Sequence, residues 1–184
     1  MIVNQTRKIE EKQIGPDMSS HDKFVAFLDA AEHRSATKIL EFGAADTSFL
    51  AELIRNADWA SKIELHCTDD GIEGFDQELT SAAENTSVQF ELVKHVGSEV
   101  EINDAVMELA SSEPFDAIFI SNSPSKESLL TSLLVCHESL KVDGVLALAS
   151  NVSGNPSMQD AITSFRDMMG DAYSESSDHV FVKA

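Results

Sequence analysis

The chain has 184 residues, of which 42% are hydrophobic and 24% charged, a composition typical of one globular domain with its own core. With 13 Lys and Arg against 32 Asp and Glu, its net charge is −19, which disfavours nucleic acid and anionic lipid as partners. It also lacks both a stretch of roughly 18 apolar residues and an apolar signal segment. We therefore expect a cytoplasmic protein that binds neither nucleic acid nor membrane. Solubility explains the acidity, and a cationic partner or substrate is the alternative.

The first 15 residues are polar and are predicted to form a helix or an arm. Gly15-Pro16-Asp17 breaks this segment and leaves residues 16–184 as a single domain. Ser19 or Ser20 can cap the helix that follows. That helix is predicted to pack on a sheet because its apolar residues recur at helical spacing, at Phe24, Phe27, Leu28 and Ala31.

The stretch from Lys38 to Leu53 predicts a strand, a turn of small residues and a helix. Its strand is apolar around one acid, Glu41, its turn begins at Gly43, and its helix carries the apolar residues on one stripe. This order is the opening unit of a doubly wound α/β sheet. In such a sheet the turn meets a nucleotide-like cofactor at a helix N-terminus.

Strands and helices alternate through the rest of the chain. Later strands are predicted at residues 63–68, 88–93, 115–121, 145–149 and 179–183, and later helices at 77–83, 102–109, 129–140 and 157–169. Gly144 is expected to be a left-handed cap between the third of these helices and the strand after it. The alternation predicts an α/β, Rossmann-like, doubly wound and mostly parallel sheet with helices on both faces. The last strand is expected to run antiparallel at the C-terminal edge.

Polar or small residues follow the strands where open α/β sheets bind their ligands, at the carboxyl edge. They are Glu41 to Ser48, Asp69-Asp70, Gly97-Ser98-Glu99, Ser121-Asn122-Ser123 and Ser150-Asn151. An acid after the second strand can accept hydrogen bonds from both hydroxyls of a ribose. Each segment alone also fits an ordinary solvated loop, so the prediction of a cofactor site rests on their combination and order.

Three segments in this order, ILEFGAADTSFLAEL, FDAIFIS and LKVDGVLALASN, resemble the class I S-adenosylmethionine-dependent methyltransferases. More narrowly, they are similar to the catechol and caffeoyl-CoA O-methyltransferase-like group. Met18-Ser19 matches the Met-Ser leader of that group, Leu40 to Ala44 its LEIGT-type motif, and Leu140 to Gly144 its LKPGG segment. The resemblance covers residues 16–184. It implies S-adenosylmethionine as cofactor and a small-molecule methyl acceptor. A Rossmann dehydrogenase is disfavoured because the G-x-G-x-x-G fingerprint is absent.

The resemblance also implies which residues hold the cofactor. The first motif would pass close to the methionine part, Asp69, or as second choice Asp70, would bind the ribose, and Gly97 and Ser98 would lie near the adenine. The Met-Ser leader would form part of a lid. The candidate cofactor-binding residues are Met18, Ser19, Glu41, Gly43, Ala44, Ser48, Asp69, Asp70, Gly97, Ser98 and Ser121.

The sequence also departs from this family. Thr47 stands near positions where the family has further glycines, and a φ above zero there would disfavour a threonine. The narrower group holds Mg²⁺ with carboxylates, but the matching residues are Ser121, Ser150 and Asn151, with Ser123 in place of a further acid. Hard cations prefer charged oxygen ligands, so we predict no catalytic metal.

Methyl transfer without a metal can use a histidine or carboxylate base. His95 follows a strand and is the candidate base by position, although a surface or supporting histidine fits the same pattern. Two functions stay open: an active, metal-independent methyltransferase, and a non-catalytic or degenerate cofactor-binding relative that acts through protein interactions. The sequence leaves the acceptor undefined and leaves a homodimer open.

Overall fold

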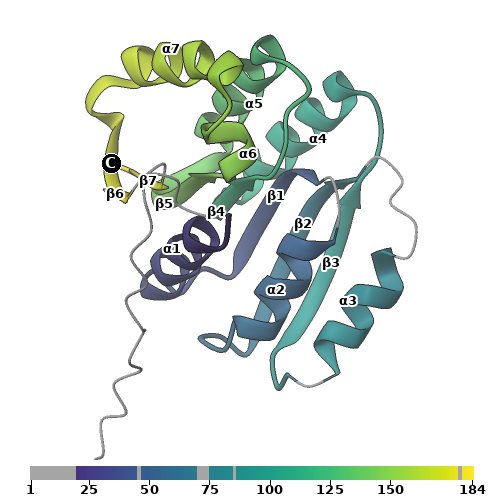
Figure 1. Ribbon diagram of the computed structural model, residues 1–184. Coiled ribbons are helices and arrows are strands. Elements are labelled where there is room, and N and C mark those ends of the chain that lie inside the picture. The colour runs from purple at the N-terminus through teal and green to yellow at the C-terminus, as the bar shows by residue number, and fades with distance from the viewer. Residues whose placement is uncertain (1–19, 45–46, 70–74, 85, 178–179) are drawn as a thin grey trace, which may run out of the picture.

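The computed structural model describes residues 20–44, 47–69, 75–84, 86–177 and 180–184. The predicted arm over residues 1–15 and the lid residues Met18 and Ser19 lie outside them. The described residues form one sheet with helices on both of its faces (Figure 1). None of their helices is long and apolar enough to cross a bilayer.

The sheet has seven strands in the order β3-β2-β1-β4-β5-β7-β6. The five strands from β3 to β5 run parallel, and β7 is antiparallel to both of its neighbours. This confirms the predicted Rossmann-like sheet with an antiparallel C-terminal edge. The strands are β1 (Lys38–Ala44), β2 (Lys62–Asp69), β3 (Gln89–His95), β4 (Phe115–Ile120), β5 (Leu140–Leu148), β6 (Tyr173–Ser177) and β7 (Val180–Lys183).

The helices lie on both faces of the sheet, and most of them connect consecutive strands. They are α1 (Ser20–His33), α2 (Ser48–Asn56), α3 (Phe75–Ala83), α4 (Glu99–Ser112), α5 (Lys126–Ser139), α6 (Ser150–Ser153) and α7 (Gln159–Met169), with 3₁₀ turns η1 (Pro156–Met158) and η2 (Gly170–Ala172). The helices predicted within the described residues are all present. Sequence reasoning missed α6 and the edge strand β6. The polar sequence of β6 lacks the apolar pattern that marked the other strands, and an edge strand does not require one.

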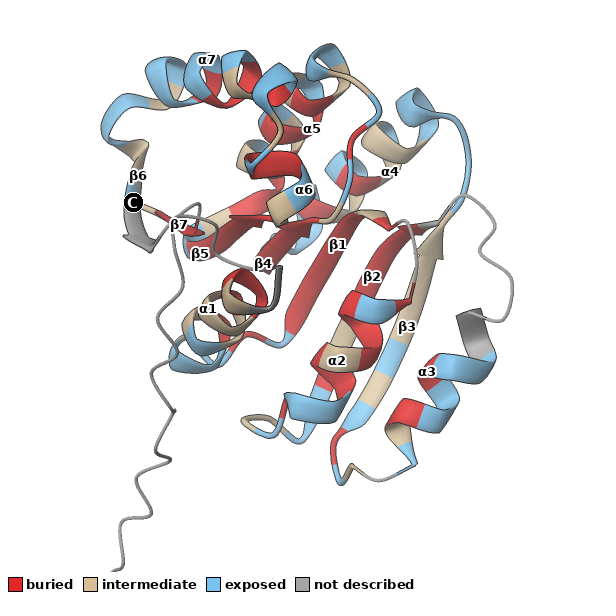
Figure 2. Ribbon diagram, in the orientation of Figure 1, coloured by how far each residue is buried: buried red, intermediate tan, exposed pale blue. Residues whose placement is uncertain are grey.

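Two apolar layers lie against the two faces of the sheet (Figure 2). α1, α2 and α3 cover one face, where the ring of Phe119 stacks on Phe49 at 4.2 Å between centroids and meets Phe27 at 5.3 Å. α4, α5 and α7 cover the other face, which Ile118 and Ile120 of the same strand approach. Alternate residues of β4 therefore serve opposite layers, as a central parallel strand requires.

The segment predicted to link a helix to the fifth strand, Lys141 to Gly144, lies inside β5, where the pairing with β4 shifts register between Leu140 and Val145. The residue with positive φ is Asp143, at 63°, and Gly144 has no positive φ. A Cβ on Gly144 would lie 2.8 Å from the Leu140 side chain and from the Lys141 carbonyl oxygen. The glycine is thus needed for a close approach, while an aspartate, which tolerates the left-handed region better than most residues, makes the turn.

Candidate functional site

The carboxyl ends of β1 and β4 meet at the centre of the sheet. From β1 the chain continues into α2 on one face, and from β4 it continues into α5 on the other. The two connections therefore separate at this edge. A parallel sheet leaves a crevice at such a point, and ligands bind there.

A pocket of about 380 Å³ occupies this crevice. Its walls come from the end of β1, the end of β2, the first turns of α4 and the segment from β4 into α5. The lining residues are Phe42, Gly43, Ala44, Thr68, Glu99, Ile102, Asn103, Asn122, Ser123, Pro124, Ser128 and Ser132. Of the candidate cofactor residues, Gly43 and Ala44 line it directly.

Gly43 brings the end of β1 close to the segment after β4 at the floor of the pocket. Its φ is 75°, and a Cβ at this position would lie 2.3 Å from the carbonyl oxygen of Asn122. Its N–H donates to the Thr68 hydroxyl at 2.6 Å, at the point where the β1–β2 register shifts between Glu41 and Ala44. Only glycine allows both the backbone angle and the contact.

Glu41 lies beside the pocket rather than in its wall. Its side chain is buried, and the hydroxyl of Ser121 donates a hydrogen bond to its carboxylate. The Ser121 N–H donates to the Phe42 carbonyl at 3.0 Å, which extends the β1–β4 pairing by one bond. Two residues predicted for the cofactor site, from motifs 80 positions apart, are therefore in direct contact.

Thr47 carries no backbone strain. Its φ is −85° and its ψ −3°, so the expected conflict with a positive φ is absent. Its buried hydroxyl donates to the carboxylate of Glu78 in α3. The threonine thereby links the segment after β1 to the helix after β2, a role that a glycine could not perform.

Four polar residues of α4 and α5 lie in the pocket wall. Glu99 belongs to the polar segment predicted after the third strand, whereas Asn103, Ser128 and Ser132 were not predicted from sequence. Glu99 and Asn103 are one turn apart on α4, and Ser128 and Ser132 are one turn apart on α5. The Ser128 hydroxyl donates to Glu99 at 2.9 Å, and the Asn103 side-chain oxygen is buried without a partner among the described residues. The available signal was the spacing, since polar residues four positions apart lie on one face of a helix.

The other described candidates lie at the end of β2 and at the starts of α2 and α4. Asp69 ends β2 and is paired with Ala44, while Asp70 lies outside the described residues. Ser48 is exposed at the first position of α2. Ser98 follows Gly97 and caps α4, since its hydroxyl accepts from the Glu101 N–H at 3.4 Å. Neither Gly97 nor Ser98 is among the lining residues.

Solved structures share this architecture. An O-methyltransferase from Bacillus cereus in complex with SAH matches with a TM-score of 0.60 and 16% identity, over 93% of this chain and 84% of that chain. The O-methyltransferase TomG from Streptomyces achromogenes, in complex with SAM, gives 0.59 and 15% over 90% and 78%. Spermidine synthase from Thermotoga maritima gives 0.54 and 18% over 90% and 57%. No family model and no curated protein sequence matches.

The chain has the Rossmann-like methyltransferase fold. The matches establish this fold at low identity, and the names of the matched proteins cover more than one activity. A fold of this kind hosts different reactions, so the function has to be argued from the site.

In this methyltransferase fold, His95 is the last residue of β3, which is the edge strand at the end of the sheet opposite β6. Its Nε2 lies 3.0 Å from Nδ1 of His66 on β2, and the two rings are stacked. The other nitrogen of His66 contacts Glu64, and its ring meets Phe115 edge-on. His95 is not among the residues that line the pocket, and its role as a base stays a prediction.

The histidine pair should make stability depend on pH. Burial, the largest cause, lowers the pKa of both rings below 6.5, and the neighbouring His66 lowers the pKa of His95 further. The folded chain therefore binds fewer protons than the unfolded chain just below pH 6.5, so stability is lost as the pH falls. His95→Gln should reduce the slope of the unfolding free energy against pH by at most about 1.4 kcal/mol per pH unit.

Urea unfolding at several pH values between about 8 and about 5 measures this effect. His33→Gln is the matched control, because His33 is exposed at the end of α1. An identical pH dependence for the original chain and His95→Gln would contradict the assignment.

The residues that the sequence resemblance places at metal positions lack the carboxylates that Mg²⁺ prefers. Ser121 donates to Glu41, the Ser150 hydroxyl is buried without a partner among the described residues, and Asn151 is exposed on α6. None of the three carries a carboxylate, whereas hard cations are held by several oxygen ligands that include acids. The described residues also contain no cluster of three or more His, Cys, Asp or Glu able to hold a metal.

Proposed function

We propose that the chain is an S-adenosylmethionine-dependent methyltransferase that acts on a small-molecule acceptor without a catalytic metal. The observation that carries the proposal is the pocket of about 380 Å³ at the switch point, with Gly43 and Ala44 in its wall. Asp69 ends the neighbouring strand opposite Ala44, at the position where an acid binds a ribose. Two proteins with this fold were solved with SAH or SAM.

The adenine end of the cofactor would lie between α4 and the loop after β4. Ile102 and Pro124 offer apolar surface to a planar ring. The Glu99 carboxylate can accept a hydrogen bond from an exocyclic amine, and the Asn103 amide lies one turn further along α4. Such a cofactor would also occupy the space beside the buried Asn103 oxygen, which has no partner among the described residues.

In the proposed reaction, a lone pair of the acceptor attacks the methyl carbon in line with its bond to sulfur. The acceptor–methyl bond forms, the carbon–sulfur bond breaks, and its electron pair stays on sulfur. The acceptor loses one proton, to water or to a base. Because the sulfonium is already a good leaving group, the residues after β4 would mainly orient the acceptor, with Asn122 and Ser123, which line the pocket, as hydrogen-bonding groups.

Calorimetry with S-adenosylmethionine, S-adenosylhomocysteine and NAD tests the cofactor. Saturable binding of the first two and competition between them is the expected result, and binding of NAD alone would contradict the proposal. Activity is then assayed over a panel of small-molecule acceptors in EDTA and in Mg²⁺. Equal rates are expected, and a requirement for Mg²⁺ would refute metal independence. Cofactor binding with no product from any acceptor would favour the non-catalytic alternative.

Filling the pocket should displace the cofactor. Ser128→Phe, on the first turn of α5, would place a ring in the space between α4 and α5 and is expected to weaken S-adenosylhomocysteine binding about tenfold or more. Thr163→Phe is the matched control, since Thr163 is exposed on α7. If both variants fold and bind S-adenosylhomocysteine equally, the cofactor does not use this pocket.

A homodimer stays a prediction that sedimentation of the full chain would test.

A further inference from the structure

A second concave surface lies on the outside of α4 and α5. Val100, Asp104 and Met107 of α4 and Leu134, Val135 and Glu138 of α5 line a groove of about 340 Å³, which we call the α4–α5 groove. Val100 is 69% exposed, Met107 38% and Leu134 37%, so apolar side chains here are accessible to solvent.

The spacing of these residues shapes the groove. Positions 100, 104 and 107 form one stripe along α4, and positions 131, 134, 135 and 138 form one stripe along α5. Since i, i+4 and i+7 lie on one side of a helix, each stripe faces the same furrow between two neighbouring helices. A third helix laid in this furrow would contact both stripes at once.

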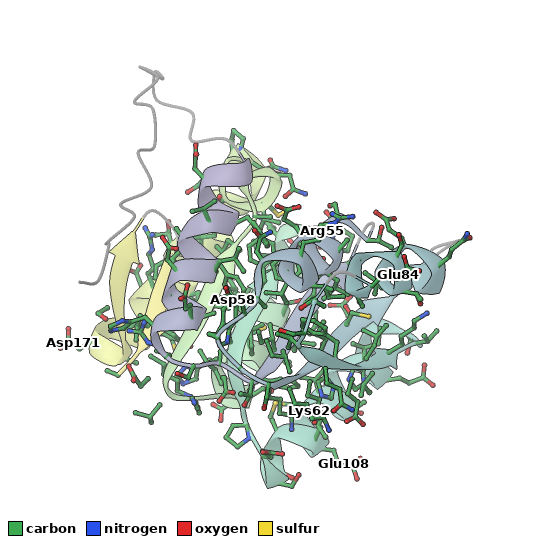
Figure 3. All side chains as sticks on the ribbon, turned by 90° about the horizontal axis from the view of Figure 1, so that it is seen from below. Arg55, Asp58, Lys62, Glu84, Glu108 and Asp171 are labelled. Carbon is green, nitrogen blue, oxygen red and sulfur yellow. The ribbon has the colours of Figure 1, made fainter. Side chains whose placement is uncertain are left out.

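The groove has an acidic rim. Asp104 and Glu138 are among its described lining residues, and none of these is basic. The whole of α4 contains four acids and no Lys or Arg. Glu108 projects from the outer side of this helix, on the opposite side of the sheet from α2 (Figure 3). Apolar floor and acidic rim therefore coincide on one surface.

We propose that the α4–α5 groove binds a basic amphipathic helix of another protein. Its apolar face would cover Val100, Met107 and Leu134, and its Lys or Arg side chains would pair with Asp104 and Glu138. A second copy of this chain fits less well, because it would bring the same acids face to face on molecules that each carry a net charge of −19. The proposal does not depend on the function of the cofactor pocket.

Calorimetry of the full chain with a designed peptide tests the proposal. The peptide is a helix of Leu and Lys with Leu at i, i+3, i+4 and i+7, and its control is a scrambled peptide of the same composition. At about 50 mM salt, where screening is weak, we expect one peptide per chain and at least about tenfold weaker binding of the scrambled peptide. Equal binding of the two peptides would show only general attraction to an acidic protein and would overturn the proposal.

Paired variants locate the binding site. Met107→Ser with Leu134→Ser should weaken peptide binding about tenfold by removing apolar contact, whereas Met168→Ser, at a residue 53% exposed on α7, should not. Asp104→Asn with Glu138→Gln should also weaken it about tenfold at low salt, whereas Asp167→Asn on α7 should not. Thermal unfolding checks that each variant is folded.

Two further outcomes would overturn the proposal. One is an equal loss of binding in the α7 controls, which would place the peptide elsewhere. The other is self-association of the original chain in sedimentation that Met107→Lys abolishes, which would make a second copy the occupant of the groove.

Discussion

Replacing Gly43 by Ala is expected to destabilise the protein by about 3 kcal/mol or more and to abolish S-adenosylmethionine binding. Two costs add. The φ of 75° is unfavourable for a residue with a Cβ, and the new Cβ would lie 2.3 Å from the Asn122 carbonyl oxygen. That oxygen belongs to the backbone, so it can retreat only if the segment after β4 moves. Such a movement would open the floor of the pocket.

Urea unfolding and calorimetry with S-adenosylhomocysteine measure the two effects of Gly43→Ala. Gly170→Ala is the matched control, because Gly170 also has a positive φ, of 51°, but no atom lies within 4 Å of its added Cβ. The control isolates the backbone cost, about 1 to 3 kcal/mol. If Gly43→Ala loses no more stability than Gly170→Ala, the contact with Asn122 is not tight and the account of this glycine is wrong.

Replacing Asp116 by Ala is expected to cost about 3 kcal/mol, because this carboxylate joins three strands of the sheet. One oxygen accepts from the backbone N–H groups of Thr37, at 2.6 Å, and Lys38, at 2.9 Å, where β1 begins. The other lies 2.5 Å from the ammonium of Lys141 on β5. Only 13% of the Asp116 side chain is exposed. Removing the carboxylate therefore leaves these donors without their acceptor.

The same carboxylate should contribute to unfolding in acid. Burial alone would raise the pKa of Asp116, but hydrogen bonds from Lys141 and from the backbone of Thr37 and Lys38 hold it below 3.8. A lowered pKa means that the stabilisation is complete above pH 3.8 and is lost as the pH falls further. Urea unfolding of Asp116→Ala at neutral and acidic pH measures both effects.

Glu91→Gln is the control for Asp116→Ala. Glu91 pairs with Lys62 at 2.6 Å, but both side chains are more than half exposed, so solvent screens the pair and its contribution to stability is small. A loss in Asp116→Ala as small as the loss in this control would contradict the assigned role of Asp116.

Local spacing was sufficient to predict the elements that carry one apolar stripe. α2 buries Phe49, Leu50, Leu53 and Ile54 as its sequence indicates, and β4 follows its nearly continuous apolar run. These predictions succeeded because the pattern that drives burial is written in neighbouring residues. They were weakest where the pattern is absent, as in the polar edge strand β6. They also failed where a glycine can serve either a left-handed turn or a close approach: Asp143 has the positive φ that was predicted for Gly144.

Contacts between distant segments could not be predicted in this way. The hydroxyl of Thr47 donates a hydrogen bond to Glu78. The ring of His95 is stacked on that of His66, and His95 does not line the pocket. Glu99 and Ser128 come together from helices that no sequence pattern relates. In each case the partner is 29 or more residues away, so only the packing of the sheet decides the contact.

The sequence by itself determined the alternation of strands and helices, the parallel sheet and the edge at which ligands would bind, because periodic burial and strand order follow from short-range chemistry. Only the tertiary structure decided which side chains line the pocket at that edge and which merely support it. The reason is geometric: β1 and β4 lie far apart in the chain, and the contact between Gly43 and Asn122 exists only after their strands have paired.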